Sequence, residues 1–340
     1  MRRTLFASIA WNSRNRAGSC TILYNPPFCC SAEDERAITV VLSVAPGLDG
    51  RCVLDRVQTK KEIESLLVSR GLTPRTRFGQ HFLIDGNLMR RLVDSAELSR
   101  DDLVLEVGPG TGGLTDLLCK YAGRVFSIEI DRDMLEILAD RYRGFDHVTI
   151  VGGDALRTKH CVAESISNAI EMFHGVGHGA VKLVSNLPYQ IATPLVMNLV
   201  VSFPAVRRLC FTVQAEVGDR LVASSGLKDY GPLAIVTQTL CTIETIARVG
   251  PGAFWPRPAV DSVMIRMIPG ASPFESPAAA RRFSMFVRGV FEHRRKTLRA
   301  ALEYVVEEET RERLARDFDL SQRPEQVPVH QWVEMSCAAF

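Results

Sequence analysis

The sequence predicts an α/β protein, in which a Rossmann-like sheet with helices on both faces is followed by a small all-helical domain at the carboxyl terminus. Between residues 59 and 213, short apolar runs that suit buried strands alternate with segments whose apolar residues recur at helical spacing. After Pro269 only the helical spacing continues. Because strands that alternate with helices form parallel sheets covered on both faces, this order predicts the α/β class.

The apolar pattern also places the individual elements. Strands are predicted at 103–107, 125–128, 148–151, 181–184 and 209–213. Helices are predicted around 63–67, 88–93, 114–118 and 134–138. The closing helices are predicted from apolar residues at helical spacing: Phe283, Phe286, Val287, Val290, Phe291, Leu298, Leu302 and Val305.

Three parts are expected: a disordered extension over 1–52, the α/β domain over 53–268, and the helical domain over 269–340. The extension is rich in arginine before its first acidic residue, Glu33, which is also typical of an organellar transit peptide. Its adjacent cysteines, Cys29 and Cys30, and its apolar run at 38–44 are not typical of such peptides. We therefore expect a cytoplasmic protein, with the mitochondrial or plastid matrix as the alternative.

Composition excludes several classes of protein. No apolar run is long enough to cross a bilayer, so no membrane association is expected. The nine cysteines include no Cys-x-x-Cys pair, which fits neither a zinc site nor a disulfide framework, so no metal is expected. The formal net charge of +2 requires that any nucleic acid be bound by a local basic patch.

A glycine-rich loop, Glu106-Val-Gly-Pro-Gly-Thr-Gly-Gly-Leu-Thr115, follows the first predicted strand. Glycines at this place allow a sharp turn and let a ligand lie against the backbone. Gly108, Gly110 and Gly113 also fit the spacing of a dinucleotide-binding loop. The loop alone leaves open whether the ligand is a dinucleotide or another nucleotide.

Carboxylates end the next two predicted strands. Glu129 stands where a ribose diol would be bound, and Asp154 stands where an acid can accept a hydrogen bond from an adenine amine. Either residue alone could instead cap the following helix. Both together, at the edge where such sheets bind ligands, favour an adenosine-containing ligand.

The tetrapeptide Asn186-Leu-Pro-Tyr189 follows the fourth predicted strand. The lone pair of an aromatic amine is delocalised, so a site that methylates it must accept its N–H hydrogen bonds and aim the lone pair at the methyl donor. The Asn186 side chain and a backbone carbonyl at Leu187 or Pro188 supply such acceptors, and Tyr189 offers a stacking face for a flipped base. The alternative is an ordinary turn, with Tyr189 as packing.

Basic residues gather near the last predicted helices. They are Arg281, Arg282, Arg288, Arg294, Arg295, Lys296 and Arg299, with Arg207 and Arg208 as an extension. Such a run is often only a solvated helix face. After a base-methylation motif, contact with RNA phosphates is the better interpretation.

With these motifs in place, the sequence resembles the small-subunit ribosomal RNA adenine dimethyltransferase family, the kasugamycin-sensitivity enzymes, from about residue 59 to 299. The motifs that carry the resemblance are Thr76-Arg-Phe-Gly-Gln-His-Phe-Leu83, the glycine loop from Glu106 to Thr115, Asn186 to Tyr189, Phe254-Trp-Pro-Arg-Pro-Ala-Val-Asp-Ser262 and the basic helix Arg294-Arg-Lys-Thr-Leu-Arg299.

The resemblance implies a class I methyltransferase sheet and S-adenosyl-L-methionine as cofactor. It implies N6,N6-dimethylation of two adjacent adenosines near the 3′ end of small-subunit rRNA, in ribosome biogenesis. The implied cofactor-binding residues are His81, Leu83, Gly108, Gly110, Glu129, Asp154 and Asn186. The implied catalytic residues are Asn186, Leu187, Pro188, Tyr189 and Phe254, the last as a second aromatic against the base. The implied RNA-binding residues are Arg294, Arg295, Lys296 and Arg299.

The expected partner is small-subunit rRNA or the immature small ribosomal subunit, bound by a monomer. His81 and Ala300 both stand where the family often has Asn. The change at Ala300 puts the RNA contact of the predicted basic helix in doubt. Three alternatives stay open: a large-subunit rRNA adenine methylase, a non-catalytic assembly or organellar transcription factor, and an NAD-dependent oxidoreductase. The late motif and the basic helix from Arg294 to Arg299 argue against the first. The intact tetrapeptide argues against the second, and the lack of a hydride-transfer acid–base pair argues against the third.

Overall fold

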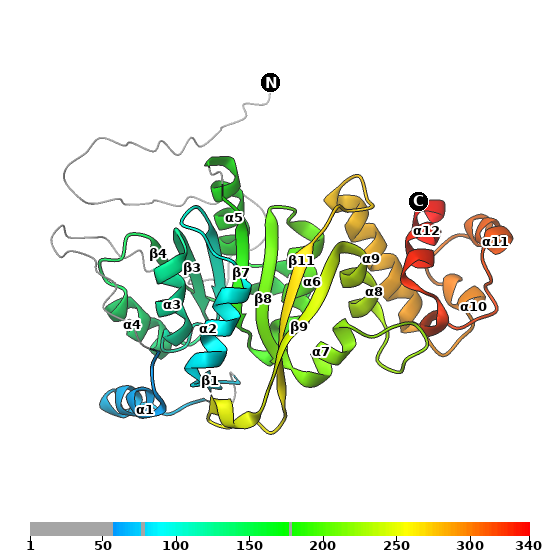
Figure 1. The fold of residues 1–340 in the computed structure, drawn as a ribbon. Coiled ribbons are helices and arrows are strands. Elements are labelled where there is room, and N and C mark those ends of the chain that lie inside the picture. The colour runs from blue at the N-terminus through cyan, green and yellow to red at the C-terminus, as the bar shows by residue number, and fades with distance from the viewer. Residues whose placement is uncertain (1–56, 76–78, 177–178) are drawn as a thin grey trace, which may run out of the picture.

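The computed structural model describes residues 57–75, 79–176 and 179–340. Its centre is a seven-stranded sheet in the order β4-β3-β2-β7-β8-β11-β9 (Figure 1). The strands are β2 (Leu103–Val107), β3 (Arg124–Glu129), β4 (Val148–Gly152), β7 (Val181–Asn186), β8 (Val206–Gln214), β9 (Cys241–Val249) and β11 (Ser262–Pro269). The strands that the apolar runs predict are all present, whereas the predicted extension over 1–52 lies outside the described residues.

The sheet is mixed rather than wholly parallel. The predicted strands run parallel to one another, from β4 through β8. Strand β11 is antiparallel to both β8 and β9, so the prediction of a parallel sheet is wrong at this edge. The reason is that β9 and β11 are joined without a crossover helix, and neither has a pure apolar run: β9 is largely exposed, and Arg266 interrupts β11.

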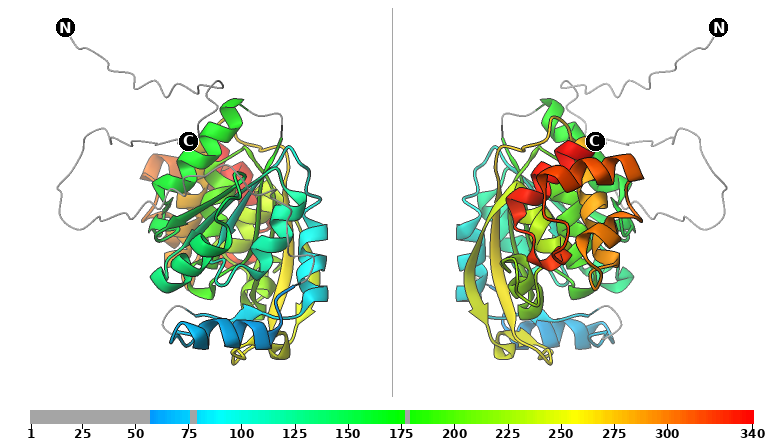
Figure 2. Two further views of the ribbon diagram at one scale, coloured as in Figure 1. Left: turned by 90° about the vertical axis from the view of Figure 1, so that its left-hand side faces the viewer. Right: turned by 90° about the vertical axis from the view of Figure 1, so that its right-hand side faces the viewer.

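Helices cover both faces of the sheet, as predicted (Figure 2). Buried residues of one face and its helices form one cluster, which includes Val104 of β2 and Leu118 of α3. Leu105, the next residue of β2, belongs to the cluster on the other face. The helices of the first face are α2 (Gly86–Ser95), α3 (Gly113–Tyr121) and α4 (Arg132–Arg141), and those of the second are α5 (Glu164–Val176), α6 (Tyr189–Ser202) and α8 (Pro232–Leu240).

The remaining elements are short, and several lie at the carboxyl ends of the parallel strands. Helix α1 packs Ile63 and Leu67 against Ile137 of α4. These elements are α1 (Lys60–Ser69), β1 (Phe82–Leu83), β5 (Leu156–Thr158), β6 (Cys161–Val162), α7 (Ala215–Leu221), the 3-10 turn η2 (Pro251–Ala253) and β10 (Phe254–Trp255). Strand β1 pairs with β10, which brings the family's first and late motifs together.

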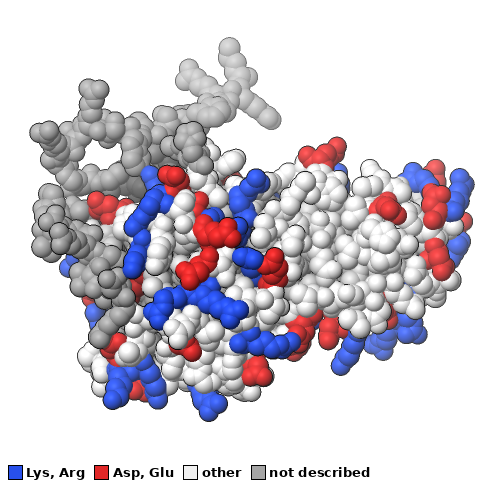
Figure 3. Space-filling model, in the orientation of Figure 1, with Lys and Arg blue, Asp and Glu red and all other residues white. Residues whose placement is uncertain are grey.

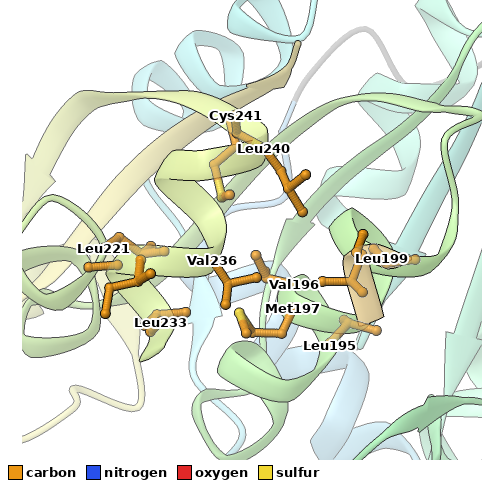
Figure 4. Close-up of a cluster of buried hydrophobic side chains, with 14 of the residues drawn as sticks. Leu195, Val196, Met197, Leu199, Leu221, Leu233, Val236, Leu240 and Cys241 are labelled. Atoms are coloured by element: carbon orange, nitrogen blue, oxygen red, sulfur yellow. The ribbon is translucent and has the colours of Figure 1, made fainter. Parts of the chain in front are cut away.

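The helical carboxyl-terminal part shares its core with the helices of the second face. Figure 4 shows Leu195 and Leu199 of α6 and Val236 of α8 in one apolar layer. Helix α9 contacts both α6 and α8, and Phe286 of α9 and Trp332 of α12 belong to the same buried cluster. The elements of this part are α9 (Pro277–Glu292), α10 (Leu298–Leu302), α11 (Glu308–Asp317), the 3-10 turn η3 (Pro324–Gln326) and α12 (Val329–Ala339).

The prediction of a basic helix over residues 294–299 is wrong. Helix α9 ends at Glu292, and the following residues form a turn before α10 starts at Leu298. The hydroxyl of Thr297 accepts a hydrogen bond from Ala300 N and so caps a new helix. Arg295 and Arg299 are therefore not one turn apart on a continuous helix, although Leu298 and Leu302 do face the core as predicted.

Within the described residues, no helix is long and apolar enough to span a membrane. In the same part of the chain, no group of three or more His, Cys, Asp or Glu side chains is placed to hold a metal ion.

Candidate active site

A cavity of about 200 Å³ lies at the carboxyl ends of β2, β3, β4 and β7. Ligands of open α/β sheets bind at this edge. Most of the residues that the sequence assigns to cofactor binding and catalysis line this one cavity. They are His81, Leu83, Gly108, Gly110, Glu129, Asp154, Asn186, Leu187, Pro188 and Tyr189.

The glycine loop forms one wall and approaches two other segments closely. Gly108 and Gly110 both have positive φ, +72° and +60°. A Cβ at Gly108 would lie 3.0 Å from Pro188 Cγ, and one at Gly110 would lie 2.8 Å from Phe82 Cε1. Glycine is therefore needed here both for the turn and for contact with the tetrapeptide and with β1.

Glu129 is buried where β3 ends beneath the loop. Its carboxylate accepts hydrogen bonds from Gly110 N at 3.0 Å and Asp131 N at 2.9 Å. Burial raises the pKa of Glu129 above its usual range, although these N–H donors oppose the change. The cap of α4 is the neighbouring Asp131, so the helix-cap interpretation of Glu129 is wrong.

Asp154 is exposed at the cavity rim and also does not cap a helix. Its side chain accepts from Leu156 N at 2.9 Å, which forms a turn before β5, whereas α5 begins only at Glu164. The carboxylates of Glu129 and Asp154 thus lie at the ends of neighbouring parallel strands and line one cavity, as the sequence predicts.

Glu106 is a site residue for which the sequence analysis assigned no role. It lines the cavity and accepts hydrogen bonds from the hydroxyls of Thr115 at 2.7 Å and Ser127 at 2.8 Å. Burial raises its pKa to about 7, although both hydroxyl donors oppose the change. A carboxylate within an otherwise apolar strand was the signal in the sequence, because such a group is buried only where it has partners.

The tetrapeptide presents a free acceptor to this region. Asn186 Nδ2 donates to the backbone oxygen of His81 at 2.9 Å, which fixes the orientation of the amide. Its Oδ1 is buried and has no hydrogen-bond partner among the described residues. Because a buried acceptor without a partner is costly, an unpaired oxygen at a cavity wall indicates a ligand donor that binds there.

Tyr189 is half-buried and held from two sides. Its hydroxyl shares a hydrogen bond of 2.7 Å with Ser262 Oγ, and its ring stacks on His81 with centroids 5.9 Å apart. Burial raises the pKa of the Tyr189 hydroxyl. His81 is itself held by a 2.8 Å hydrogen bond between its Nδ1 and the backbone oxygen of Pro256.

Phe254 is the one predicted catalytic residue that does not line the described cavity. It is 2% exposed and pairs with Leu83 between β10 and β1. Its neighbour Trp255 is half-buried and stacks on Phe82 at 6.1 Å. The role of Phe254 against a target base therefore stays a prediction. Thr76, Arg77 and Phe78 of the first motif lie outside the described residues.

The predicted RNA-binding residues Arg294, Arg295, Lys296 and Arg299 are all exposed around the turn between α9 and α10. Arg208 does not extend this group. It lies near the amino end of β8, away from the cavity edge, and its guanidinium is 2.6 Å from the Glu97 carboxylate.

Comparison with known proteins agrees with this geometry. Residues 71–338 match the ribosomal RNA adenine dimethylase family. The chain belongs to this family. Membership confirms the predicted adenine dimethyltransferase activity and the S-adenosyl-L-methionine cofactor, and it excludes an oxidoreductase.

The relatives of this ribosomal RNA adenine dimethylase include the ribosomal RNA small subunit methyltransferase A of Moorella thermoacetica. The two are 38% identical over 252 residues, which are 73% of this chain and 85% of the relative. A dimethyladenosine transferase from Plasmodium falciparum has the same fold, with a TM-score of 0.60 at 23% identity over 75% of this chain and 96% of that one. The 23S rRNA methyltransferase ErmE has a TM-score of 0.54 at 25% identity over 76% of this chain and 99% of that one.

Proposed function

We propose that this dimethylase transfers two methyl groups to N6 of each of two adjacent adenosines near the 3′ end of small-subunit rRNA. The observation that carries the chemistry is the buried, unpartnered Oδ1 of Asn186 at the cavity wall. The choice of the small subunit rests on the 38% identity to a small-subunit methyltransferase, against 25% to the large-subunit enzyme.

The cavity residues fit S-adenosyl-L-methionine. The glycine loop leaves room for a ligand against the backbone, and Glu129 and Asp154 are placed to accept from ribose hydroxyls and an adenine amine, respectively. Leu83 and His81 close the cavity from β1 and the turn before it. When bound, the cofactor supplies a methyl group activated by its sulfonium charge.

Asn186 prepares the nucleophile. Its Oδ1 accepts one N–H of the adenine amine, and a backbone carbonyl accepts the other. The Pro188 carbonyl already accepts from Ile191 N at 3.1 Å, which favours Leu187 for this second contact. Both bonds pull the nitrogen towards tetrahedral geometry, so its lone pair leaves the ring system and points at the methyl carbon.

Tyr189 would hold the flipped base by stacking, because its ring is fixed by Ser262 and His81. The methylated amine is acidic, so its proton can pass to solvent without a strong base in the site. The exposed cations of the α9–α10 turn would hold the RNA backbone of the rRNA or of the immature small subunit. We propose that the enzyme acts as a monomer in the cytoplasm.

Mass spectrometry of small-subunit rRNA from cells with and without this protein tests the proposal. We expect dimethylated adenosines to disappear from that RNA when the gene is deleted, and to return with the wild-type protein but not with Asn186→Ala. If deletion of the gene instead removed methylated adenosines from large-subunit rRNA, the choice of the small subunit would be wrong.

A further inference from the structure

An aromatic pair lies on the surface beside the basic turn between α9 and α10. The rings of His293 and Tyr304 stack with centroids 3.8 Å apart and an angle of 22° between their planes. Lys296 Nζ lies 4.4 Å from the centroid of the Tyr304 ring. Tyr304 is 56% exposed although His293 stacks on one face of its ring and the Lys296 ammonium donates to its hydroxyl.

Helix α9 and the end of α10 hold the two rings of the pair in place. His293 is the C-cap of α9, and Tyr304 follows the end of α10, where Tyr304 N donates to Ala301 O. Next to it, Val305 Cγ2 lies 3.1 Å from the position that a Cβ on Gly289 would take, so this segment packs directly on α9. An exposed ring that is already fixed loses little freedom when a ligand stacks on it.

Among the described residues, several exposed cations beside the aromatic pair have no ion-pair partner, which favours an anionic ligand. Within the described part of the chain, none of Arg294, Arg295 and Lys296 is in an ion pair, and all three are exposed. Two acids of the following segment are already paired, since Glu312 lies 2.6 Å from Arg299 and Glu303 lies 3.3 Å from Arg311. Unpaired cations beside exposed aromatic rings are typical of single-stranded nucleic-acid sites.

The turn lies at the same edge of the molecule as the cavity. Near the start of α9, Arg281 contacts Ser202 at the end of α6. Helix α9 then runs back along α6 towards Tyr189, the first residue of α6. The residues after Glu292 therefore approach the side of the molecule on which the cavity lies. Figure 3 shows basic side chains along the lower edge of the molecule, below the carboxyl-terminal helices.

We propose that His293, Lys296 and Tyr304 form a platform on which an unpaired base of the RNA substrate stacks, outside the methylation cavity. The Tyr304 ring carries the base, Lys296 and the unpaired arginines hold the adjoining phosphates, and His293 supports the ring from behind. This inference depends on the proposed function, because it assumes that the substrate is RNA. It adds a second point of attachment, which positions the strand while the target base is in the cavity.

The test compares two RNA probes with the full-length protein: a short oligoadenylate and the same chain with abasic sites. Tyr304→Leu is expected to weaken binding of oligoadenylate by about tenfold, the effect of losing one base–aromatic stack, and to leave binding of the abasic chain unchanged. Tyr304→Phe keeps the ring and removes only the hydroxyl to which Lys296 donates, so it should bind oligoadenylate more tightly than Tyr304→Leu. In wild-type protein, 2-aminopurine in the oligonucleotide should lose fluorescence on binding.

Tyr121 provides a matched control. It is 40% exposed and has Lys120 Nζ 5.6 Å from its ring centroid, but it lies at the end of α3. Tyr121→Leu should bind both probes as the wild type does. Unchanged binding of oligoadenylate by Tyr304→Leu, or an equal loss on both probes, would overturn the platform.

A separate assay distinguishes failure of the platform from failure of the proposed function. If the wild-type protein did not methylate undermethylated small subunits, the proposed function would fall, and the oligoadenylate comparison would still decide the platform. Equal thermal unfolding of the Tyr304 variants and the wild type excludes a loss of folding.

Discussion

The cavity and the α9–α10 turn are built in opposite ways. In the cavity, polar groups such as Glu129 and Asn186 are buried and fixed by backbone contacts. In the turn, Arg294 and Arg295 are exposed and without ion pairs in the described part of the chain. Buried, fixed groups suit a reaction that depends on orientation, because they need no reorganisation. Exposed cations suit the holding of phosphates, which needs charge more than geometry.

The largest effect is expected for Asn186→Ala. It should lower the rate of methyl transfer by at least about a hundredfold, because orientation and charge stabilisation of the amine are both lost. Binding of S-adenosyl-L-methionine should remain measurable. Asn198→Ala is the control, since the Asn198 amide also donates to a backbone oxygen, that of Lys159, but lies outside the cavity wall. Near-normal turnover of Asn186→Ala in a purified assay would contradict the mechanism.

Glu129→Ala should weaken binding of S-adenosyl-L-methionine by about 1–3 kcal/mol, the loss expected when hydroxyl donors lose a charged acceptor. Isothermal titration calorimetry measures this change. Glu136→Gln, an exposed substitution on the adjoining α4, should leave the affinity as it is. An unchanged affinity for Glu129→Ala would mean that the cofactor binds elsewhere.

The two arginines at the turn should differ. Arg295→Gln should weaken RNA binding and reduce the slope of log affinity against log salt by about 0.7–0.9, the value for one phosphate contact. Arg299→Gln should change the slope less, because Glu312 already neutralises Arg299. Binding measured over a range of salt concentrations decides between them. Equal slopes for Arg295→Gln and the wild type would show that Arg295 contacts solvent and not an RNA phosphate.

The smallest effect concerns pH. The pKa of Glu106 in the folded protein is raised to about 7, above its ordinary value of 4.5. A raised carboxyl pKa stabilises the fold below about 4.5, and this contribution is lost as the pH rises through about 7. Glu106→Gln should therefore gain stability relative to the wild type between pH 5 and pH 8, by roughly 2–4 °C for each kcal/mol of difference. Thermal unfolding without cofactor measures it, and a constant difference across this range would contradict the burial argument.

The sequence predicted the cavity well because its signals are local. Buried apolar runs that end in Gly108, Glu129 or Asn186 mark both the strand and the residue at its carboxyl end. The orientation of the Asn186 amide was not predictable, because it depends on the backbone of His81, more than a hundred residues away in the sequence.

The turn was predicted less well. A basic run with apolar spacing fits a helix, and only Thr297 indicates that a new helix starts there. The burial of Phe254 was also missed, because its pairing with Leu83 joins segments that are distant in sequence.

The core that α6 and α8 share with α9 has a consequence for how the chain unfolds. Because Leu195 and Val236 belong to the same buried cluster as residues of the carboxyl-terminal helices, and α9 contacts both α6 and α8, removing those helices would expose that cluster to water. We therefore expect the two parts to unfold together rather than independently, because they share one core. Proteases that cut within the last helices would produce an aggregating fragment, rather than a smaller active enzyme.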